Sequence, residues 1–353
     1  MRYIISSAVA SLALSLPALA EVPRVVTDIH PVHSLVAQVM GDLGSPELLL
    51  ERGASEHDFQ LRPSQAAGLA EADLVVWIGP ELTPWLERAL DGIGGDAARL
   101  GLLAVPGSVL RAYSADGAHG DHAEEAGHEG HEGHGHDAHG HDDHVAEGAD
   151  DGHGHDDHGH DDHAAEGADD GHGHDGDHAH EGTDPHAWLE PENAKVWLAA
   201  IAVKLGELDP ANAAAYAANA GAAAARVDAV DAEVAALLAP VKGKPVVVYH
   251  DAYGYFAAHY GLEVFGSVAL GDATAPGAAR LAALREGVEG GGSVCLFPEA
   301  QHDPALIEQL AEGTGGRVGA ALDPNGSLQD PGAGAWEGTL RALAVAMAEC
   351  AAG

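Results

Sequence analysis

Histidine is the residue whose placement in this chain points most directly to chemistry. Of the 25 histidines, 18 lie between His119 and His180, interleaved with Asp, Glu and Gly and without any Lys or Arg. Neutral imidazole is a borderline-soft ligand that suits zinc, copper and nickel, and nearby carboxylates add attraction for a cation. We therefore expect auxiliary metal binding by the histidines of this tract: His119, His122, His128, His131, His134, His136, His139, His141, His144, His153, His155, His158, His160, His163, His172, His174, His178 and His180.

Three short motifs outside the tract carry further histidines. His57 lies in GASEHDF at 53–59, His186 in DPHAWL at 184–189 and His250 in YHDAYGYF at 249–256. His57 and His250 follow predicted strands, and loops beyond the carboxyl ends of parallel strands form ligand crevices. Asp323, directly after the last predicted strand, is another candidate. One such histidine is more often an ordinary polar residue than a ligand, but the set indicates a site.

The other four histidines are interpreted as structural. We expect His30, His33, His259 and His302 to be solvated or to cap helices, because they flank or lie within predicted helices and turns. Glu299 ends a predicted strand near the expected crevice. It either orients a metal ligand or is a surface or helix-capping acid, and the sequence does not choose between the two.

Buried strands and helices alternate along the chain and predict an α/β fold with parallel sheets. Removal of the first 20 residues and the tract leaves about 270 residues, which favours two lobes over one core. Apolar runs predict strands at 24–27, 47–50, 74–78, 246–249, 293–297 and 316–322. Helical patterns occur at 31–40, 62–70, 191–205, 278–288, 304–311 and 335–351.

One Ala-rich segment, 210–239, predicts a single long helix. Asp209 is a suitable N-cap with Pro210 at the first helical position, and about 30 residues at ~1.5 Å each reach ~45 Å. Such a helix can link two lobes or lie on the surface of one. Its apolar positions require packing along much of its C-terminal half, at Val227, Val230, Val234, Leu237 and Leu238.

The first 20 residues are typical of a cleaved secretory signal peptide. Arg2 precedes an apolar run at 4–16, and Ala18-Leu19-Ala20 forms a small-residue cleavage pattern. No later stretch is long and apolar enough to span a membrane. We therefore expect a soluble periplasmic protein with a signal peptide at 1–20, an N-terminal lobe at 21–208, a linking helix at 209–240 and a C-terminal lobe at 241–353.

The charge distribution limits the partners. The formal net charge is −40, but 21 of the 56 carboxylates lie between Asp121 and Glu181. Neither nucleic acid nor direct membrane insertion fits so acidic a chain, since nucleic acids and anionic bilayers need a basic surface. Within the tract, 139–155 recurs at 158–174 with one Val-to-Ala change and has no apolar face to bury. We expect 115–183 to be a disordered loop without metal, inserted in the N-terminal lobe.

Cys295 and Cys350 are the only cysteines. An oxidising compartment favours a disulfide between them, which would fix the last helix. The alternative is a pair of unpaired buried thiols.

The three histidine motifs, in their order and spacing, resemble those of the periplasmic zinc-binding proteins of high-affinity zinc ABC importers, a family of metal-binding solute-binding proteins. The resemblance covers the mature chain except the tract, where the family carries a variable His- and acid-rich loop. It implies two lobes, each a small parallel sheet flanked by helices, joined by one rigid helix, with metal in the cleft between them. The segment 210–239 matches that helix.

The resemblance also implies a ligand set. His57, His186 and His250 match the family's three imidazole ligands, and Glu56 matches an acid that can complete the shell. Asp323 matches a direct ligand of manganese-binding relatives, which have a carboxylate in place of His250. Three nitrogens and one oxygen suit tetrahedral zinc better than manganese. The two cysteines match a disulfide that some members contain.

The function implied is capture of Zn²⁺, as transported substrate, and its delivery to the membrane permease of an ABC importer. The protein would be a monomer without enzymatic activity, and an accessory periplasmic zinc chaperone is a further possible partner. The His-rich loop would acquire or buffer zinc. Two alternatives stay open: an extracytoplasmic metal buffer or adhesin, and a zinc hydrolase, which lacks support because no HExxH or GxSxG motif is present. Selectivity over copper, nickel, cobalt and cadmium, and the choice of fourth ligand, also stay open.

Overall fold

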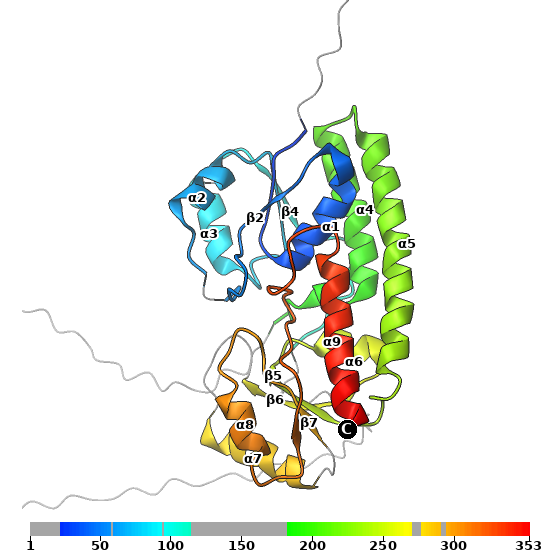
Figure 1. The fold of residues 1–353 in the computed structure, drawn as a ribbon. Helices are drawn as coiled ribbons and strands as arrows, with labels where there is room; N and C mark the ends of the chain where they lie inside the picture. The colour runs from blue at the N-terminus through cyan, green and yellow to red at the C-terminus, as the bar shows by residue number, and fades with distance from the viewer. Residues whose placement is uncertain (1–21, 58, 94, 114–181, 270–276, 291–293) are drawn as a thin grey trace, which may run out of the picture. The chain divides into compact units, whose positions relative to one another are not determined.

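The computed structural model describes residues 22–57, 59–93, 95–113, 182–269, 277–290 and 294–353. Its strands form two parallel four-stranded sheets (Figure 1). The first has the order β2 (Glu47–Leu48), β1 (Val25–Thr27), β3 (Leu74–Trp77), β4 (Ala98–Gly101). The second has the order β6 (Val264–Ala269), β5 (Val246–His250), β7 (Cys295–Leu296), β8 (Arg317–Val318). The predicted α/β class with two parallel sheets is confirmed.

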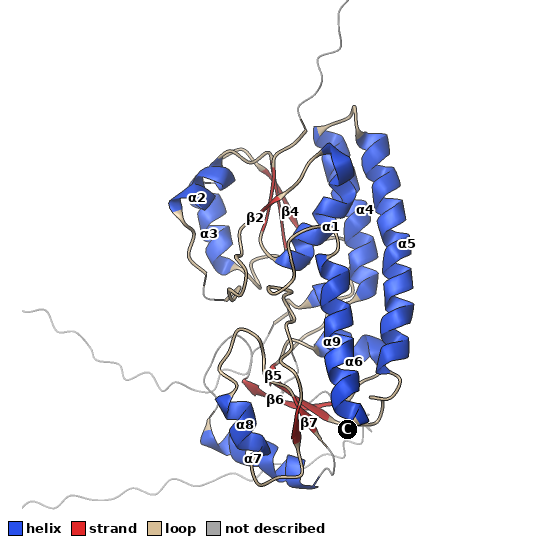
Figure 2. Ribbon diagram, in the orientation of Figure 1, coloured by secondary structure: helices blue, strands red, loops and turns tan. Residues whose placement is uncertain are grey.

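Helices cover both faces of each sheet (Figure 2). In chain order they are α1 (His30–Met40), α2 (Pro63–Ala70), α3 (Pro84–Ile93), α4 (Pro191–Leu208), α5 (Ala213–Leu238), α6 (Gly254–Tyr260), α7 (Ala278–Gly290), α8 (Ala305–Ala311) and α9 (Ala335–Ala352), with short 3₁₀ turns η1 (Gly41–Leu43) and η2 (Ala187–Leu189). Helices α2 and α3 lie on one side of the first sheet, and α7 and α8 lie beside the second. None of the helices described is long and apolar enough to cross a lipid bilayer.

Coverage of both faces explains why the central strands are continuously apolar. In β3, Leu74 and Val76 join the main core, whereas Val75 and Trp77 contact the smaller cluster beneath α2 and α3. Successive side chains of a strand point to opposite faces, so a strand buried on both faces has no polar positions to alternate with. This is the physical basis on which β1, β3 and β5 could be predicted from apolar runs.

The second sheet repeats the arrangement. Val246 and Val248 join the main core, and Val247 joins a separate cluster with residues of α7 and α8. The main core continues through buried residues of α4, α5 and α9, so the described residues belong to one compact unit. The lobe boundaries at 208 and 241 remain a prediction.

The long helix begins at Ala213, not at Pro210. Asp209, which we expected to be its N-cap, instead ends α4, and its carboxylate accepts hydrogen bonds from Asn212 and from the hydroxyl of Tyr216. The backbone therefore turns before α5 starts. Helix α5 packs along α4, α1 and α9, and its buried positions include Val227, Val230, Val234 and Leu238, as the apolar spacing indicated.

Two strands were absent from the prediction. Strand β4 lies at the edge of the first sheet, and Arg99 in its middle is exposed. Strand β6 lies at the edge of the second, and its sequence VFGSVA contains Gly266 and Ser267. Edge strands tolerate polar and small residues, so neither segment carries the apolar run by which the central strands were recognised.

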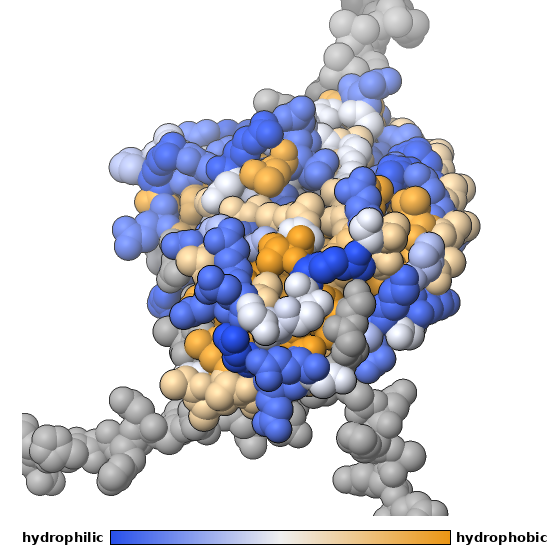
Figure 3. Space-filling view, turned by 60° about the horizontal axis from the view of Figure 1, so that its bottom comes forward, coloured by the Kyte–Doolittle hydropathy of each residue, from blue (hydrophilic) through white to orange (hydrophobic). Residues whose placement is uncertain are grey.

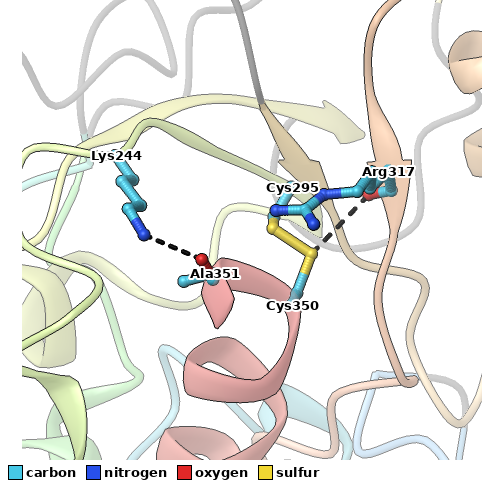
Figure 4. Close-up of a disulfide and its surroundings, with 5 residues drawn as sticks. All are labelled: Lys244, Cys295, Arg317, Cys350 and Ala351. Atoms are coloured by element: carbon cyan, nitrogen blue, oxygen red, sulfur yellow. Dashed lines mark hydrogen bonds between the residues drawn. A yellow bond between two sulfur atoms is a disulfide. The ribbon is translucent and has the colours of Figure 1, made fainter. Parts of the chain in front are cut away.

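The predicted disulfide between Cys295 and Cys350 is present, with a Cα–Cα distance of 6.1 Å. It joins β7 to the last turns of α9 (Figure 4). Nearby, the ammonium of Lys244 donates a hydrogen bond of 2.7 Å to the carbonyl of Ala351. The C-terminal helix is therefore attached to the second sheet covalently and by a polar contact, while its other face packs on α5 and α1.

Figure 3 brings forward the face near the second sheet, where hydrophilic residues predominate and smaller hydrophobic patches lie between them. Among the exposed large hydrophobic residues described, Phe265 belongs to β6 and Val318 to β8. The predicted signal peptide and all 18 tract histidines lie outside the described residues.

Candidate metal centre

His57, His186 and His250 come together, as predicted. One nitrogen from each ring lies within 4.8 Å of the other two, and the ring centroids are 6.2, 6.0 and 5.2 Å apart. The Nε2 atoms of His186 and His250 are 3.3 Å apart. A tetrahedral ion about 2.0–2.1 Å from each of two nitrogens holds them roughly 3.3–3.4 Å apart. The rings of His186 and His250 therefore already have the separation that a tetrahedral zinc shell requires.

Each histidine is positioned by a different part of the fold. His57 lies in the loop that follows β2, His186 is the residue before η2, and His250 is the last residue of β5. Gly53, at φ 74°, provides the turn that starts the His57 loop, and its N–H donates to the carbonyl of Ser327. Left-handed backbone of this kind favours glycine. The site thus draws on segments that are far apart in the sequence.

Two buried carboxylates set the tautomers of the ligand rings. Nδ1 of His186 lies 2.7 Å from Asp184, and Nδ1 of His250 lies 2.6 Å from Glu299. An ionised carboxylate only accepts hydrogen bonds, so each Nδ1 must carry the proton. Each Nε2 lone pair is then directed toward the other rings, which is the arrangement by which carboxylates orient metal-bound histidines. Of the two choices left open for Glu299, orientation of a ligand fits this geometry.

The segment carrying His186 is fixed on several sides. Asp184 donates its backbone N–H to the carbonyl of Arg111, and its own carbonyl accepts from the hydroxyl of Tyr255. Trp188, fully buried and 5.2 Å from the His186 ring, donates its indole N–H to the carbonyl of Pro324. These bonds hold His186, itself 0% exposed, in one orientation.

Glu56 is buried beside the histidines. Its Oε1 lies 3.6 Å from Nε2 of His57, close to the separation of two ligands on one ion, and its other oxygen accepts a hydrogen bond from Asn325. The indole of Trp85 donates to the backbone carbonyl of Glu56. One carboxylate oxygen is therefore placed next to the His57 ring, although Glu56 is not part of either group of possible ligand atoms within the described residues.

Asp323 is positioned differently. Its Oδ1 accepts from Gln301 and from the backbone and hydroxyl of Ser327, and its Oδ2 accepts from the backbone of Leu328. It is not part of either group of possible ligand atoms within the described residues. Its carboxylate shapes the turn that follows it. That turn supports the His57 loop in two ways: the carbonyl of Ser327 accepts from the N–H of Gly53, and Asp330 forms an ion pair with Arg52.

Our interpretation of His30 and His33 as solvated or capping residues is wrong. Both are buried in α1, at 1% and 5% exposed. Burial lowers the pKa of His30 to about 4 and also lowers the pKa of His33, whose Nε2 donates to the carbonyl of Pro46. Their burial arises because α1 packs on β1, β2, α4 and α9, contacts that the local sequence does not specify.

His259 and His302 also have specific partners. His259 bridges Glu190 at 2.7 Å and Asp231 at 2.9 Å, and so connects α6 to α4 and α5. His302 stacks on Tyr249 with ring centroids 4.3 Å apart, and its Nε2 lies 3.8 Å from Glu299. Neither role was predicted. For Asp184, which was also not proposed as a site residue, a signal existed: it precedes His186 by two residues.

The ends of the His-rich segment meet beside the centre. Ala112 and Thr183 form an isolated antiparallel bridge, and Tyr113 donates to the carbonyl of Gly182. This pairing lies directly before Asp184 and His186 in the chain. The two ends of the described chain, at Tyr113 and Gly182, therefore lie next to each other, four residues before His186 in the sequence.

Chemically, the cluster offers three imidazole nitrogens in a largely buried setting, with the carboxylate of Glu56 beside His57. His57 also lines a pocket of about 540 Å³ with Phe59, Trp85 and Arg88. Three nitrogens and one oxygen fit borderline ions such as zinc better than hard ions such as manganese.

Known proteins resemble the chain over most of its length. It matches the family model described as "ZnuA: Zinc-uptake complex component A periplasmic" over residues 25–350. It is 50% identical over 336 residues to the "High-affinity zinc uptake system protein ZnuA" of Paracoccus denitrificans, covering 95% of this chain and 94% of that relative.

Among solved structures, a crystal structure of ZnuA is similar with a TM-score of 0.64 at 22% identity, covering 93% of this chain and 99% of that one. The solute-binding protein FpvC from Pseudomonas aeruginosa, in complex with Mn²⁺, has a TM-score of 0.66 at 20% identity, covering 93% of this chain and 98% of that one. At these identities the two structures support the fold alone.

Proposed function

Because this chain belongs to the ZnuA family, the periplasmic zinc-binding components of zinc uptake systems, we propose that His57, His186 and His250 capture the Zn²⁺ ion that it carries. The family is made up of solute-binding components of transporters and not of enzymes. Zinc is therefore the substrate, held and released without chemical change.

One observation gives the strongest support for this ligand set. The Nε2 atoms of His186 and His250 are 3.3 Å apart, and the Nδ1 atom of each ring faces a buried carboxylate. Two neutral imidazoles with converging lone pairs are costly to keep so close unless something binds between them. A zinc ion satisfies both lone pairs at once.

For the fourth position we propose Glu56, with water as the alternative. Its Oε1 is near Nε2 of His57, while Asn325 holds its other oxygen. Asp323 is less suited, because four hydrogen bonds already occupy its two oxygens. The shell would carry one negative charge, which offsets part of the charge of the buried dication.

Delivery would take place at the membrane permease of an ABC importer, which the family membership implies as the partner. We further propose that residues 1–20 are a signal peptide removed on export, that the protein acts as a monomer, and that an accessory periplasmic chaperone is a possible zinc donor.

For the His-rich tract we propose a loading role. Its two ends pair at Ala112 and Thr183, close to His186 in the chain, so ions held on its imidazoles and carboxylates would be released near the centre. Deletion of residues 119–180 should then slow zinc loading at scarce zinc and leave the affinity of the centre unchanged. Equal loading rates would indicate a buffering role instead.

The test of the ligand set is anomalous scattering at the zinc edge from crystals given one zinc ion per chain. The expected result is one dominant peak bonded to His57, His186 and His250, with its fourth ligand visible. Substitution His186→Ala should remove that peak, whereas His259→Ala, at a histidine outside the cluster, should not. A dominant peak elsewhere, with the three histidines unligated, would overturn the proposal.

A further inference from the structure

His250 belongs to two groups of possible metal ligands. Besides the group with His57 and His186, one atom from each of His250, Glu299 and His302 lies within 4.8 Å of the other two. We propose that this second group is an outer zinc site, through which the ion enters and leaves the inner centre. The inference rests on the proposed function of the inner site.

The outer group is built on rigid structure. Glu299 pairs with Leu322 in an isolated parallel bridge beyond β7, and Ala300 donates to the carbonyl of Leu322. The backbone N–H of His302 donates to the carbonyl of Glu299, and the imidazole stacks on Tyr249 with an interplanar angle of 15°. The carboxylate and the His302 ring are therefore held near one another before an ion arrives.

Burial distinguishes an outer from an inner position. The side chain of His302, which belongs only to the outer group, is 22% exposed, whereas those of His57 and His186, which belong only to the inner group, are 9% and 0% exposed. The shared His250 and Glu299 are each 4% exposed. The outer group offers two nitrogens and one carboxylate, one imidazole fewer than the inner group. Fewer ligands and greater exposure favour weaker and faster binding, as an entry site requires.

The shared ring makes the two sites mutually exclusive. In the inner site Nε2 of His250 binds the ion and Nδ1–H donates to Glu299. In the outer site Nδ1 binds the ion together with Glu299 and His302, and Nε2–H donates to Nε2 of His186, 3.3 Å away. The imidazole keeps one proton throughout, so transfer of the ion requires only that this proton change nitrogen through solvent.

The first test locates the outer site directly. Crystals of the full chain with His57→Ala and His186→Ala, soaked in zinc, should give an anomalous peak bonded to His302 and Glu299. Adding His302→Phe, which retains a ring to stack on Tyr249 but has no nitrogen, should abolish the peak. No peak at His302 in the double variant, or one that persists in the triple variant, would overturn the inference.

The second test measures exchange in a chain whose inner site is intact. Zinc loading and release to excess chelator can be followed by intrinsic tryptophan fluorescence, with a Trp188→Phe chain to identify the contribution of Trp188, 5.2 Å from the His186 ring. For His302→Phe, both rates should fall about 10-fold while the equilibrium affinity stays within about two-fold, because the route changes and the end state does not. Unchanged rates would overturn the inference. Absence of zinc from the inner site of the unaltered chain would instead refute the proposed function.

Discussion

Nδ1 of His186 lies 2.7 Å from Oδ1 of Asp184, and the same oxygen accepts the backbone N–H of His186. One carboxylate thus fixes both the backbone and the ring of His186, the most buried of the three clustered histidines. Glu299 does the same for the His250 ring from 49 residues away. The first contact is encoded locally and the second depends on the pairing of strands in the second sheet.

Removal of the Asp184 carboxylate should weaken zinc binding without removing a ligand. Partners of metal-bound histidines typically contribute 10- to 100-fold in affinity, so we expect a loss of about 10-fold for Asp184→Asn and about 100-fold for Asp184→Ala. Competition with a chelator of nanomolar affinity measures the tight site alone. Asp228→Asn, at an exposed aspartate on α5, is the matched control. An unaltered affinity for Asp184→Ala would contradict the orienting role.

Loss of a proposed metal ligand should reduce zinc affinity more than loss of the Asp184 carboxylate. We expect His57→Ala to reduce zinc affinity by more than about 100-fold, since one of three nitrogens is lost from the shell. Cells that depend on the variant should fail to grow at scarce zinc and recover when zinc is plentiful. His259→Ala should support growth in both conditions. Growth of the His57→Ala strain at scarce zinc would point to the tract, and not the centre, as the functional element.

His259 should make the free energy of unfolding decrease as the pH rises into the alkaline range. Hydrogen bonds to Glu190 and then to Asp231 raise the pKa of this imidazole to about 9, above its ordinary value of 6.5. A pKa raised by folding adds stability that is complete below about pH 6.5 and is lost as pH rises through about 9. Because the group is partly exposed, we expect about 1–2 kcal/mol.

The measurement is the free energy of unfolding in urea, with EDTA present, for the unaltered chain and for His259→Gln. The difference between the two chains should be largest near pH 6 and disappear by about pH 10. Groups that titrate in both chains cancel in that difference. A difference that is independent of pH would show that the contact with Glu190 and Asp231 is not ionic.

The disulfide should stabilise the fold with little effect on the centre. Cys295 and Cys350 close a loop with a sequence separation of 55 residues. Chain-entropy estimates give about 4 kcal/mol for such a loop, and measured losses are typically 2–4 kcal/mol. We expect Cys295→Ser with Cys350→Ser to unfold at lower urea concentration and to bind zinc with unchanged affinity.

Dithiothreitol should produce the same loss of stability in the unaltered chain and none in the serine variant. A large drop in the zinc affinity of the variant would mean that the attachment of α9 positions the metal ligands as well as stabilising the second sheet.

The sequence predicted those features whose signal is local or whose residue types are uncommon. Apolar runs predicted β1, β3 and β5, and the spacing of Val227, Val230 and Val234 predicted the buried face of α5. The convergence of His57, His186 and His250 followed from three specific motifs taken together.

The features that were missed, or left open as for Glu299, depend on contacts between distant segments. Burial of His30 follows from the packing of α1 on other helices, and the role of Glu299 follows from its position beside His250 in the folded sheet. His302 was misread because its stacking partner, Tyr249, lies on β5, more than 50 residues away in the chain. No periodicity or propensity in the surrounding residues records such contacts.

The short pairing of Ala112 with Thr183 has a consequence for how this chain can vary. Once two residues are paired in this way, each doubling of the length of chain between them adds only about 0.6 kcal/mol to the free-energy cost of closing the loop. The 19-residue duplication could therefore arise without disturbing the ligand beyond Thr183. The number of histidines between Ala112 and Thr183 can therefore differ while the backbone that carries His186 stays the same.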